Sequence, residues 1–233
     1  MGSSSAKRIQ TSLLGAAEKK LLVRIANRLP KWMTSDFLTW TGFFGAVICA
    51  VGYALGNINI EFLWISSFGL FVNWFGDSLD GTLARVRNTQ RPTYGFFIDH
   101  ALDAFTITIM CIGAGLSPMF NLNIGLLVLA GYLVISIHTY LLTILKDEFR
   151  LTYGGLGPTE FRLIMVLINI VATYTPWQNV NLDLCGVYFG LFELIGIGII
   201  VILWTMNIVN FRKDLHYFAL KDPVKPYDPD KKA

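Results

Sequence analysis

Six apolar segments, each close to the length of a membrane-spanning helix, limit what this chain can fold into. A helix needs about 20 mostly apolar residues to cross a bilayer. The chain has such segments at residues 37–55, 62–79, 96–115, 122–145, 162–177 and 186–210. Hydrophobic residues make up 54% of the chain and charged residues only 15%, which is too apolar for an ordinary soluble domain. The sequence therefore predicts an all-α integral membrane protein with six transmembrane helices.

The positions of the basic residues predict how these helices are oriented. All 19 Lys and Arg residues lie before residue 37, between the second and third segments, between the fourth and fifth, or from Arg212 onward. Because basic residues concentrate in cytoplasmic connections, both termini are expected in the cytoplasm, and the membrane would be the inner one in a bacterium. The net charge of +3 suits anchoring to anionic lipid, so no nucleic-acid partner is expected.

The residues before the first span read as an amphipathic helix at 12–33 that lies in the membrane interface. Thr34 and its two neighbours then offer capping side chains for the first span. Three prolines and several charges in the last residues predict a mobile tail. The chain is therefore divided into an N-terminal cytoplasmic or interfacial segment, a six-helix membrane domain and a cytoplasmic tail, at residues 1–36, 37–211 and 212–233.

Four aspartates lie where the second apolar segment ends and the third begins, namely Asp77, Asp80, Asp99 and Asp103. Residues three or four apart share one face of a helix, so each pair marks one face. Carboxylates at membrane depth are costly unless positive charge lies among them. If the two faces meet, the acids form a box that suits a pair of divalent cations. Oxygen ligands without a His or Cys cluster favour Mg²⁺ or Mn²⁺ over Zn²⁺.

Small residues and an arginine accompany these aspartates in a longer motif. It reads Asp77-x-x-Asp80-Gly81-x-x-Ala84-Arg85, then Gly95-x-x-x-Asp99-x-x-x-Asp103. This motif resembles the signature of the CDP-alcohol phosphotransferases, also called CDP-alcohol phosphatidyltransferases, which are membrane enzymes that build phospholipid head groups. The connection from Arg85 to Gly95 is one residue longer than in most members. The resemblance implies transfer of a substituted phosphate group from a CDP-linked donor to an alcohol acceptor, with release of CMP, by a homodimer among membrane lipids.

The resemblance also implies roles for individual residues. The four aspartates take the metal-binding positions, and Asp103 is in addition the general base that removes the acceptor's hydroxyl proton. Gly81 and Ala84 take positions where small residues admit the cytidine, and Gly95 keeps the opposing helix face open. Arg85 stabilises the donor phosphates or only anchors its helix at the interface. Two ions about 3.5–4 Å apart would bridge the carboxylates and the donor diphosphate.

Three other polar residues each have a functional and a structural interpretation. Arg162, in the first turn after Pro158, could bind a phosphate or polar head group of the acceptor, or only snorkel to the interface. Asn73, one turn before Asp77, could add a polar group to the site or hydrogen-bond a neighbouring helix. The same two interpretations hold for His138.

These residues leave the donor open. A short six-helix chain resembles bacterial members that transfer a phosphatidyl group from CDP-diacylglycerol to glycerol phosphate, inositol phosphate or serine, and we favour this donor. Residues 97–100 (FIDH) and 157–160 (GPTE) instead resemble the branch that transfers phosphocholine or phosphoethanolamine to diacylglycerol. A cation transporter is a remote alternative, because such proteins show inverted repeats or broken midplane helices. In this sequence no repeat is evident, and the acids lie near one surface. An inactive scaffold is disfavoured by the complete set of aspartates.

Overall fold

Helices make up most of the computed structural model, which describes residues 7–9, 15–146, 148–150, 157–177, 181–184 and 187–224. In chain order the helices are α1 (Gly15–Ala26), α2 (Ser35–Leu55), α3 (Leu63–Val86), α4 (Pro92–Gly115), α5 (Leu122–Lys146), α6 (Pro158–Tyr174) and α7 (Leu191–Lys221). A 3-10 turn, η1 (Ile60–Phe62), leads into α3. The short strands are β1 (Lys7–Ile9), β2 (Glu148–Arg150), β3 (Asn181–Leu184) and β4 (Val187–Gly190). β1 pairs parallel with β2, and β3 pairs antiparallel with β4.

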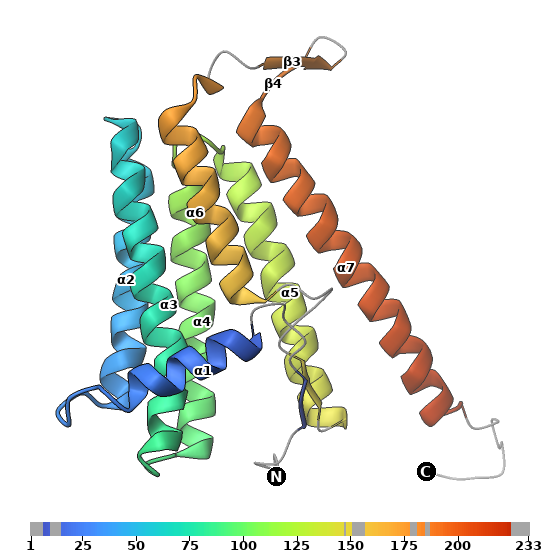
Figure 1. Ribbon diagram of the computed structural model, residues 1–233. Coiled ribbons are helices and arrows are strands. Elements are labelled where there is room, and N and C mark those ends of the chain that lie inside the picture. Colours follow the sequence, from blue (N-terminus) through green and yellow to red (C-terminus); the bar gives the residue numbers. More distant parts are fainter. Residues whose placement is uncertain are drawn as a thin grey trace.

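The helices from α2 to α6 stand side by side and alternate in direction, while α7 leans away from the others (Figure 1). α1 lies across one end of this bundle, which is also the end where α3 and α7 finish and α4 begins (Figure 1). Leu22 and Ala26 of α1 pack there in one apolar cluster with Leu38, Leu79 and Leu83. The connection that separates the two aspartate pairs therefore lies at the same end of the molecule as α1.

Four helices in the described part of the chain are long and apolar enough to cross a membrane, namely α2, α4, α5 and α7. They agree with the predicted class of all-α membrane protein. The other two predicted spans correspond to α3 and α6. α3 carries two aspartates and an arginine, and α6 has only 17 residues. Both still pack in the bundle, since α3 contacts α2 along its length and α6 contacts α3. Six membrane crossings stay a prediction.

The backbones of α2 and α3 are in close contact along a row of glycines that we call the glycine seam, formed by Gly42, Gly45, Gly69 and Gly76. A Cβ added to Gly45 would clash with the backbone of Asn73, one added to Gly69 with that of Cys49, and one added to Gly76 with that of Gly42. Small residues allow membrane helices to approach this closely, and such packing replaces the hydrophobic force that lipid does not supply. The seam therefore fixes α3, with its two aspartates, against α2.

Side-chain hydrogen bonds reinforce the same contact. Ser66 Oγ donates to the carbonyl oxygen of Cys49 (3.0 Å), and Asn73 Nδ2 donates to that of Gly42 (2.9 Å). Asn73 thus makes the helix–helix bond that was one of its two interpretations.

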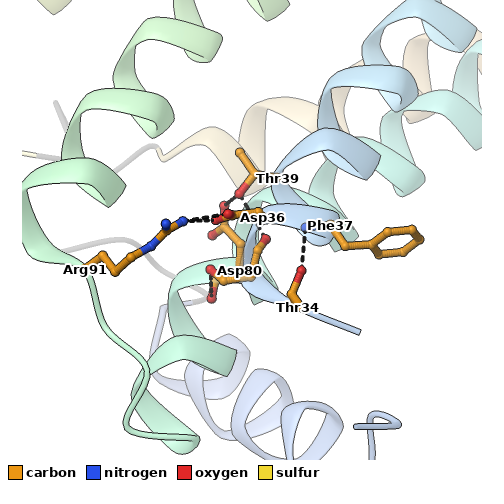
Figure 2. Close-up of polar contacts among 7 residues, drawn as sticks. Thr34, Asp36, Phe37, Thr39, Asp80 and Arg91 are labelled. Carbon is orange, nitrogen blue, oxygen red and sulfur yellow. Dashed lines mark hydrogen bonds and ion pairs between the residues drawn. The ribbon is translucent and has the colours of Figure 1, made fainter. Parts of the chain in front are cut away.

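The predicted helix over 12–33 is shorter in the structure, where α1 spans Gly15–Ala26 and residues 12–14 lie outside the described part of the chain. α1 ends at Ala26, and Arg87 donates to the carbonyl oxygens of Leu29, Pro30 and Met33, which satisfies these groups without a helix. The predicted cap is confirmed, because Thr34 Oγ1 accepts a hydrogen bond from the Phe37 amide (3.1 Å; Figure 2). α2 begins at Ser35 as a result.

The last helix is longer than predicted. α7 continues to Lys221, so residues 212–221 of the predicted tail are helical, and residues 225–233 lie outside the described part of the chain. Asp214 explains the extension. Its carboxylate bonds Lys146 Nζ at 2.6 Å and lies 3.2 Å from His138 Nε2, and both partners belong to α5. His138 therefore takes part in a contact between helices, which was the structural interpretation of this residue.

Candidate active site

Three of the predicted aspartates converge from two helices. Asp77 lies on α3, and Asp99 and Asp103 lie one turn apart on α4. Each offers one carboxylate oxygen, and the three oxygens all lie within 4.8 Å of one another. Hard divalent cations take several carboxylate oxygens at short distances. We call these three residues the carboxylate cluster, and its composition fits such an ion.

Asp80 lies beside the carboxylate cluster, and its carboxylate is hydrogen-bonded to α2. Its Oδ2 accepts a hydrogen bond from Thr39 Oγ1 (2.7 Å), its Oδ1 accepts one from the Gly81 amide, and its backbone oxygen accepts one from Ser35 Oγ (2.9 Å; Figure 2). Residues three apart on a helix differ by about 60° in direction, so Asp77 and Asp80 share a face while Asp80 is near enough to α2 to bond it. Of the four acids in the predicted box, Asp77, Asp99 and Asp103 therefore form the close cluster, and the buried Asp80 lies beside them.

All four aspartates nevertheless line one small pocket of about 20 Å³. The remaining lining residues come from α2, α3 and α4, and are Thr39, Gly42, Phe43, Asn73, Leu102 and Thr106. Such a volume accommodates a guest of about the size of one water molecule. The acidic lining makes a cation the guest that this pocket favours.

Arg162 reaches the site from the first turns of α6. Its Nη2 donates to Asp77 Oδ2 (2.7 Å), and its Nε donates to Asn73 Oδ1 (2.9 Å). The guanidinium therefore lies within the site, and snorkelling alone does not describe it. Asn73 serves both interpretations, because its amide nitrogen bonds α2 while its oxygen orients Arg162. The structure thus places a fixed positive charge beside the carboxylate cluster.

The positions that the resemblance assigns to the nucleotide are open. Among the residues that the structure describes, a Cβ added to Gly95 would meet no neighbouring atom within 4 Å, and one added to Gly81 would meet only the tip of Arg85, at 3.4 Å. Ala84 is half-buried, and the exposed Arg85 donates to Thr82 Oγ1 (3.0 Å). Packing against the described residues therefore does not explain either glycine, and the space beside them suits a bound molecule.

An ion pair at the edge of the site was not predicted from the sequence. Arg91, just before α4, donates to both carboxylate oxygens of Asp36 on α2, at 2.7 and 2.6 Å (Figure 2). Its guanidinium also stacks on the Tyr94 ring, 3.7 Å from the centroid. Hydrogen bonding to Asp36 raises the pKa of Arg91 above its ordinary value. These contacts tie the connection between α3 and α4 to the start of α2.

His100 packs between α4 and α5. Its ring stacks on Phe96, with 4.1 Å between centroids, and lies 5.2 Å from the ring of Tyr140. Its Nδ1 is 2.8 Å from the Phe96 carbonyl oxygen and 3.7 Å from Asp99 Oδ2. His100 is therefore next to the carboxylate cluster, but its ring is engaged by neighbours outside it.

Comparison with known proteins identifies the class. The model of the CDP-alcohol phosphatidyltransferase family matches residues 32–209. Archaetidylinositol phosphate synthase of Methanothermobacter thermautotrophicus is 31% identical over 162 residues, which cover 68% of this chain and 77% of that protein. Cholinephosphotransferase 1 of Danio rerio is 23% identical over 187 residues, 74% of this chain and 47% of that protein.

The chain therefore belongs to the CDP-alcohol phosphatidyltransferase family and is a transferase of substituted phosphate groups. Members generally depend on divalent metal ions and use a CDP-linked donor, an alcohol acceptor and lipid substrates. With four apolar helices of sufficient length, it is an integral membrane protein. Because this family consists of transferases, the cation-transporter and inactive-scaffold alternatives are no longer needed.

Proposed function

We propose that this enzyme transfers a phosphatidyl group from CDP-diacylglycerol to the hydroxyl of a phosphorylated polar alcohol and releases CMP. One observation carries the proposal: the Arg162 guanidinium lies 2.7 Å from Asp77, beside the carboxylate cluster. A cation held by the acids suits the donor diphosphate. The neighbouring guanidinium suits a second phosphate, since Arg binds phosphate through paired hydrogen bonds.

In this proposal Asp77, Asp80, Asp99 and Asp103 bind Mg²⁺ or Mn²⁺, with two ions in the complete site. The carboxylate cluster supports this assignment because its oxygens are close enough to share a cation. When bound, the metal neutralises charge that grows on the leaving phosphate. Asp80, held by Thr39, completes the acidic wall of the pocket.

The remaining roles follow from where each side chain lies. Asp103 acts as the general base and takes the proton of the acceptor hydroxyl. Arg162 orients the acceptor through its phosphate. Gly81, Ala84 and Gly95 leave room for the cytidine part of the donor, and Arg85 contacts the donor phosphates. The open space at both glycines supports this assignment.

We also propose a topology for the enzyme. Six spans would form the membrane domain at 37–211, α1 would lie in the interface within segment 1–36, and the last residues, 212–233, would be cytoplasmic. The alternating helix directions and the grouping of basic residues support a site on the cytoplasmic face of the membrane. By family resemblance the enzyme would work as a homodimer, in the inner membrane if it is bacterial.

The two relatives differ in how they bear on the substrate. The name of the archaeal relative specifies a phosphorylated inositol lipid as its product, and that match has the higher identity. The name of the second relative specifies transfer of phosphocholine. Together with residues 97–100, it keeps a choline or ethanolamine phosphotransferase as the second candidate. Arg162 favours the first, because its guanidinium, held beside the carboxylate cluster by Asp77 and Asn73, places a positive charge where a phosphorylated acceptor would bring an anion.

A donor-by-acceptor screen tests the proposal. Purified enzyme in detergent would be given CDP-diacylglycerol with inositol 1-phosphate, glycerol 3-phosphate or serine, or else CDP-choline or CDP-ethanolamine with diacylglycerol. CMP release and lipid mass spectrometry report turnover. We expect turnover with CDP-diacylglycerol and a phosphorylated acceptor, only with Mg²⁺ or Mn²⁺ present.

Two variants complete the screen. Asp99→Asn and Asp103→Asn should each lower the rate by about 10³-fold, the scale expected when a metal ligand or general base is lost. Full rates in both variants would refute the catalytic assignment. Turnover with CDP-choline in place of CDP-diacylglycerol would establish the second candidate instead.

A further inference from the structure

Glu18 connects three helices at the edge of the site. It lies on α1, outside the residues that match the family model. Its Oε1 accepts a hydrogen bond from Trp74 Nε1 on α3 (2.7 Å) and another from Thr159 Oγ1 on α6 (2.7 Å). One carboxylate oxygen therefore holds a side chain from each of two helices that do not belong to the same hairpin.

Both partners of Glu18 stand next to residues of the site. Trp74 follows Asn73 and precedes Asp77 by three residues, and Thr159 precedes Arg162 by three residues. Residues three apart are neighbours on a helix surface. The two helix segments that Glu18 joins are thus the two that meet in the contacts of Arg162 with Asn73 and Asp77.

The start of α6 is a favourable place for a carboxylate. Thr159 lies in the first turn of this helix, where the helix dipole is positive; Glu160 of the same turn already accepts from the Gly157 amide (3.0 Å), and Glu18 accepts from the Thr159 hydroxyl. Hydrogen bonds to a charged acceptor are stronger than neutral ones. Glu18 is therefore well suited to fix the first turn of α6 in position.

We propose that Glu18 is a positioning residue, which holds the first turn of α6 against α3 so that Arg162 stays aimed at the acceptor phosphate. The proposal rests on the role given to Arg162 in the proposed function. In this proposal α1 contributes to the geometry of the site. Loss of Glu18 would make the position of the Arg162 side chain less fixed, which weakens acceptor binding more than it changes the chemical step.

Two substitutions at one position separate this role from general stability. Glu18→Leu removes both hydrogen bonds, whereas Glu18→Gln keeps a carbonyl oxygen that can accept them. Kinetics would use CDP-diacylglycerol and whichever of inositol 1-phosphate and glycerol 3-phosphate gives turnover. We expect Glu18→Leu to raise the acceptor KM about tenfold, with kcat changed less than about twofold, as for lost uniform binding. Glu18→Gln, which keeps the acceptor but not the charge, should stay much closer to the wild type than Glu18→Leu does, and the control Lys19→Ala, an exposed neighbour on α1, should resemble the wild type.

A double-mutant cycle tests whether Glu18 acts through Arg162. Arg162→Gln alone should raise the acceptor KM, and adding Glu18→Leu should then raise it no further, because coupled residues are not additive. An equal rise in both backgrounds, or Glu18→Gln as impaired as Glu18→Leu, would overturn the proposal. An unchanged KM in Arg162→Gln would instead refute the proposed function of Arg162, and with it this inference.

A spectroscopic measurement tests the contact without any substrate. The indole ¹H–¹⁵N resonance of Trp74 can be assigned by its absence in Trp74→Phe. It should shift in Glu18→Leu and stay near its wild-type position in Glu18→Gln and Lys19→Ala. A Trp74 resonance that does not respond to Glu18→Leu would overturn the proposal, whatever the kinetics show.

Discussion

Glycines in two adjacent parts of this enzyme meet very different surroundings. In the glycine seam between α2 and α3, an added Cβ would collide with the backbone of the opposite helix. At Gly81 and Gly95, an added Cβ would meet only a flexible arginine tip or nothing. Folding alone accounts for the first set. The second set lies beside the aspartates, and the space it leaves is what the proposed donor would fill.

The seam should be the part most sensitive to a single added methyl group. Gly76→Ala forces a Cβ into the backbone of Gly42, which cannot move as a flexible side chain would. We expect a loss of more than about 3 kcal/mol of stability, at the upper end of overpacking effects. Thermal unfolding in detergent measures it. Gly198→Ala on α7 is the matched control, because its added Cβ meets no neighbouring atom within 4 Å among the described residues. Equal melting temperatures for the two variants would contradict this difference between the two sets of glycines.

Gly95 should show the reverse pattern. Gly95→Ala places its methyl in open space, so stability should be unchanged or rise by up to about 1 kcal/mol, the helix-propensity difference between the two residues. If the cytidine occupies that space, the KM for CDP-diacylglycerol should rise at least about tenfold, equivalent to about 1.4 kcal/mol. Steady-state kinetics and thermal unfolding of the same preparation give both numbers. Wild-type kinetics would remove the proposed role of this glycine.

Much of this arrangement was predictable from residue spacing. The face shared by Asp99 and Asp103 and the all-helical membrane class followed from helical periodicity and hydropathy, and the structure agrees with both. The orientation of Asp80 was not predictable, because it depends on Thr39, 41 residues earlier in the chain. Contacts between distant segments leave no mark in local spacing.

The glycine seam and Glu18 were missed for the same reason. The sequence does not show whether a glycine such as Gly76 faces a neighbouring helix or a ligand. Only the positions of the packed backbones distinguish the two cases. Glu18 reads as one polar residue on an amphipathic helix until α3 and α6 are placed beside it. The extension of α7 likewise depends on Asp214 reaching α5.

Thr39 should have an intermediate effect on the site. Thr39→Val removes the hydrogen bond to Asp80 Oδ2 and leaves a buried carboxylate less satisfied. We expect kcat/KM to fall about tenfold, which corresponds to about 1.4 kcal/mol of transition-state stabilisation. Thr41→Val is the matched control, because its hydroxyl bonds only the Phe37 carbonyl of its own helix among the contacts described here. The two variants should differ clearly in rate, and similar rates would mean that Thr39 does not act through Asp80.

The exposed ion pair at the edge of the site should matter least to stability. Arg91→Ala should lower the melting temperature by no more than about 2 °C, because exposed pairs contribute little. The pKa of Arg91 is raised in the folded state by its bond to Asp36, so its stabilising effect is complete below the unfolded pKa and fades only in strongly alkaline solution. The difference in melting temperature between wild type and variant should therefore be equal at pH 7 and pH 9. A difference that disappears by pH 9 would contradict this sign.

Binding of Mn²⁺, followed by electron paramagnetic resonance on the purified enzyme, tests most directly whether the acids of α3 and α4 gather a cation. We predict that the wild type and Gly95→Ala bind Mn²⁺ alike, and that Asp99→Asn and Asp103→Asn each weaken binding by at least about tenfold. Equal Mn²⁺ affinity in the wild type and in both aspartate variants would contradict the account.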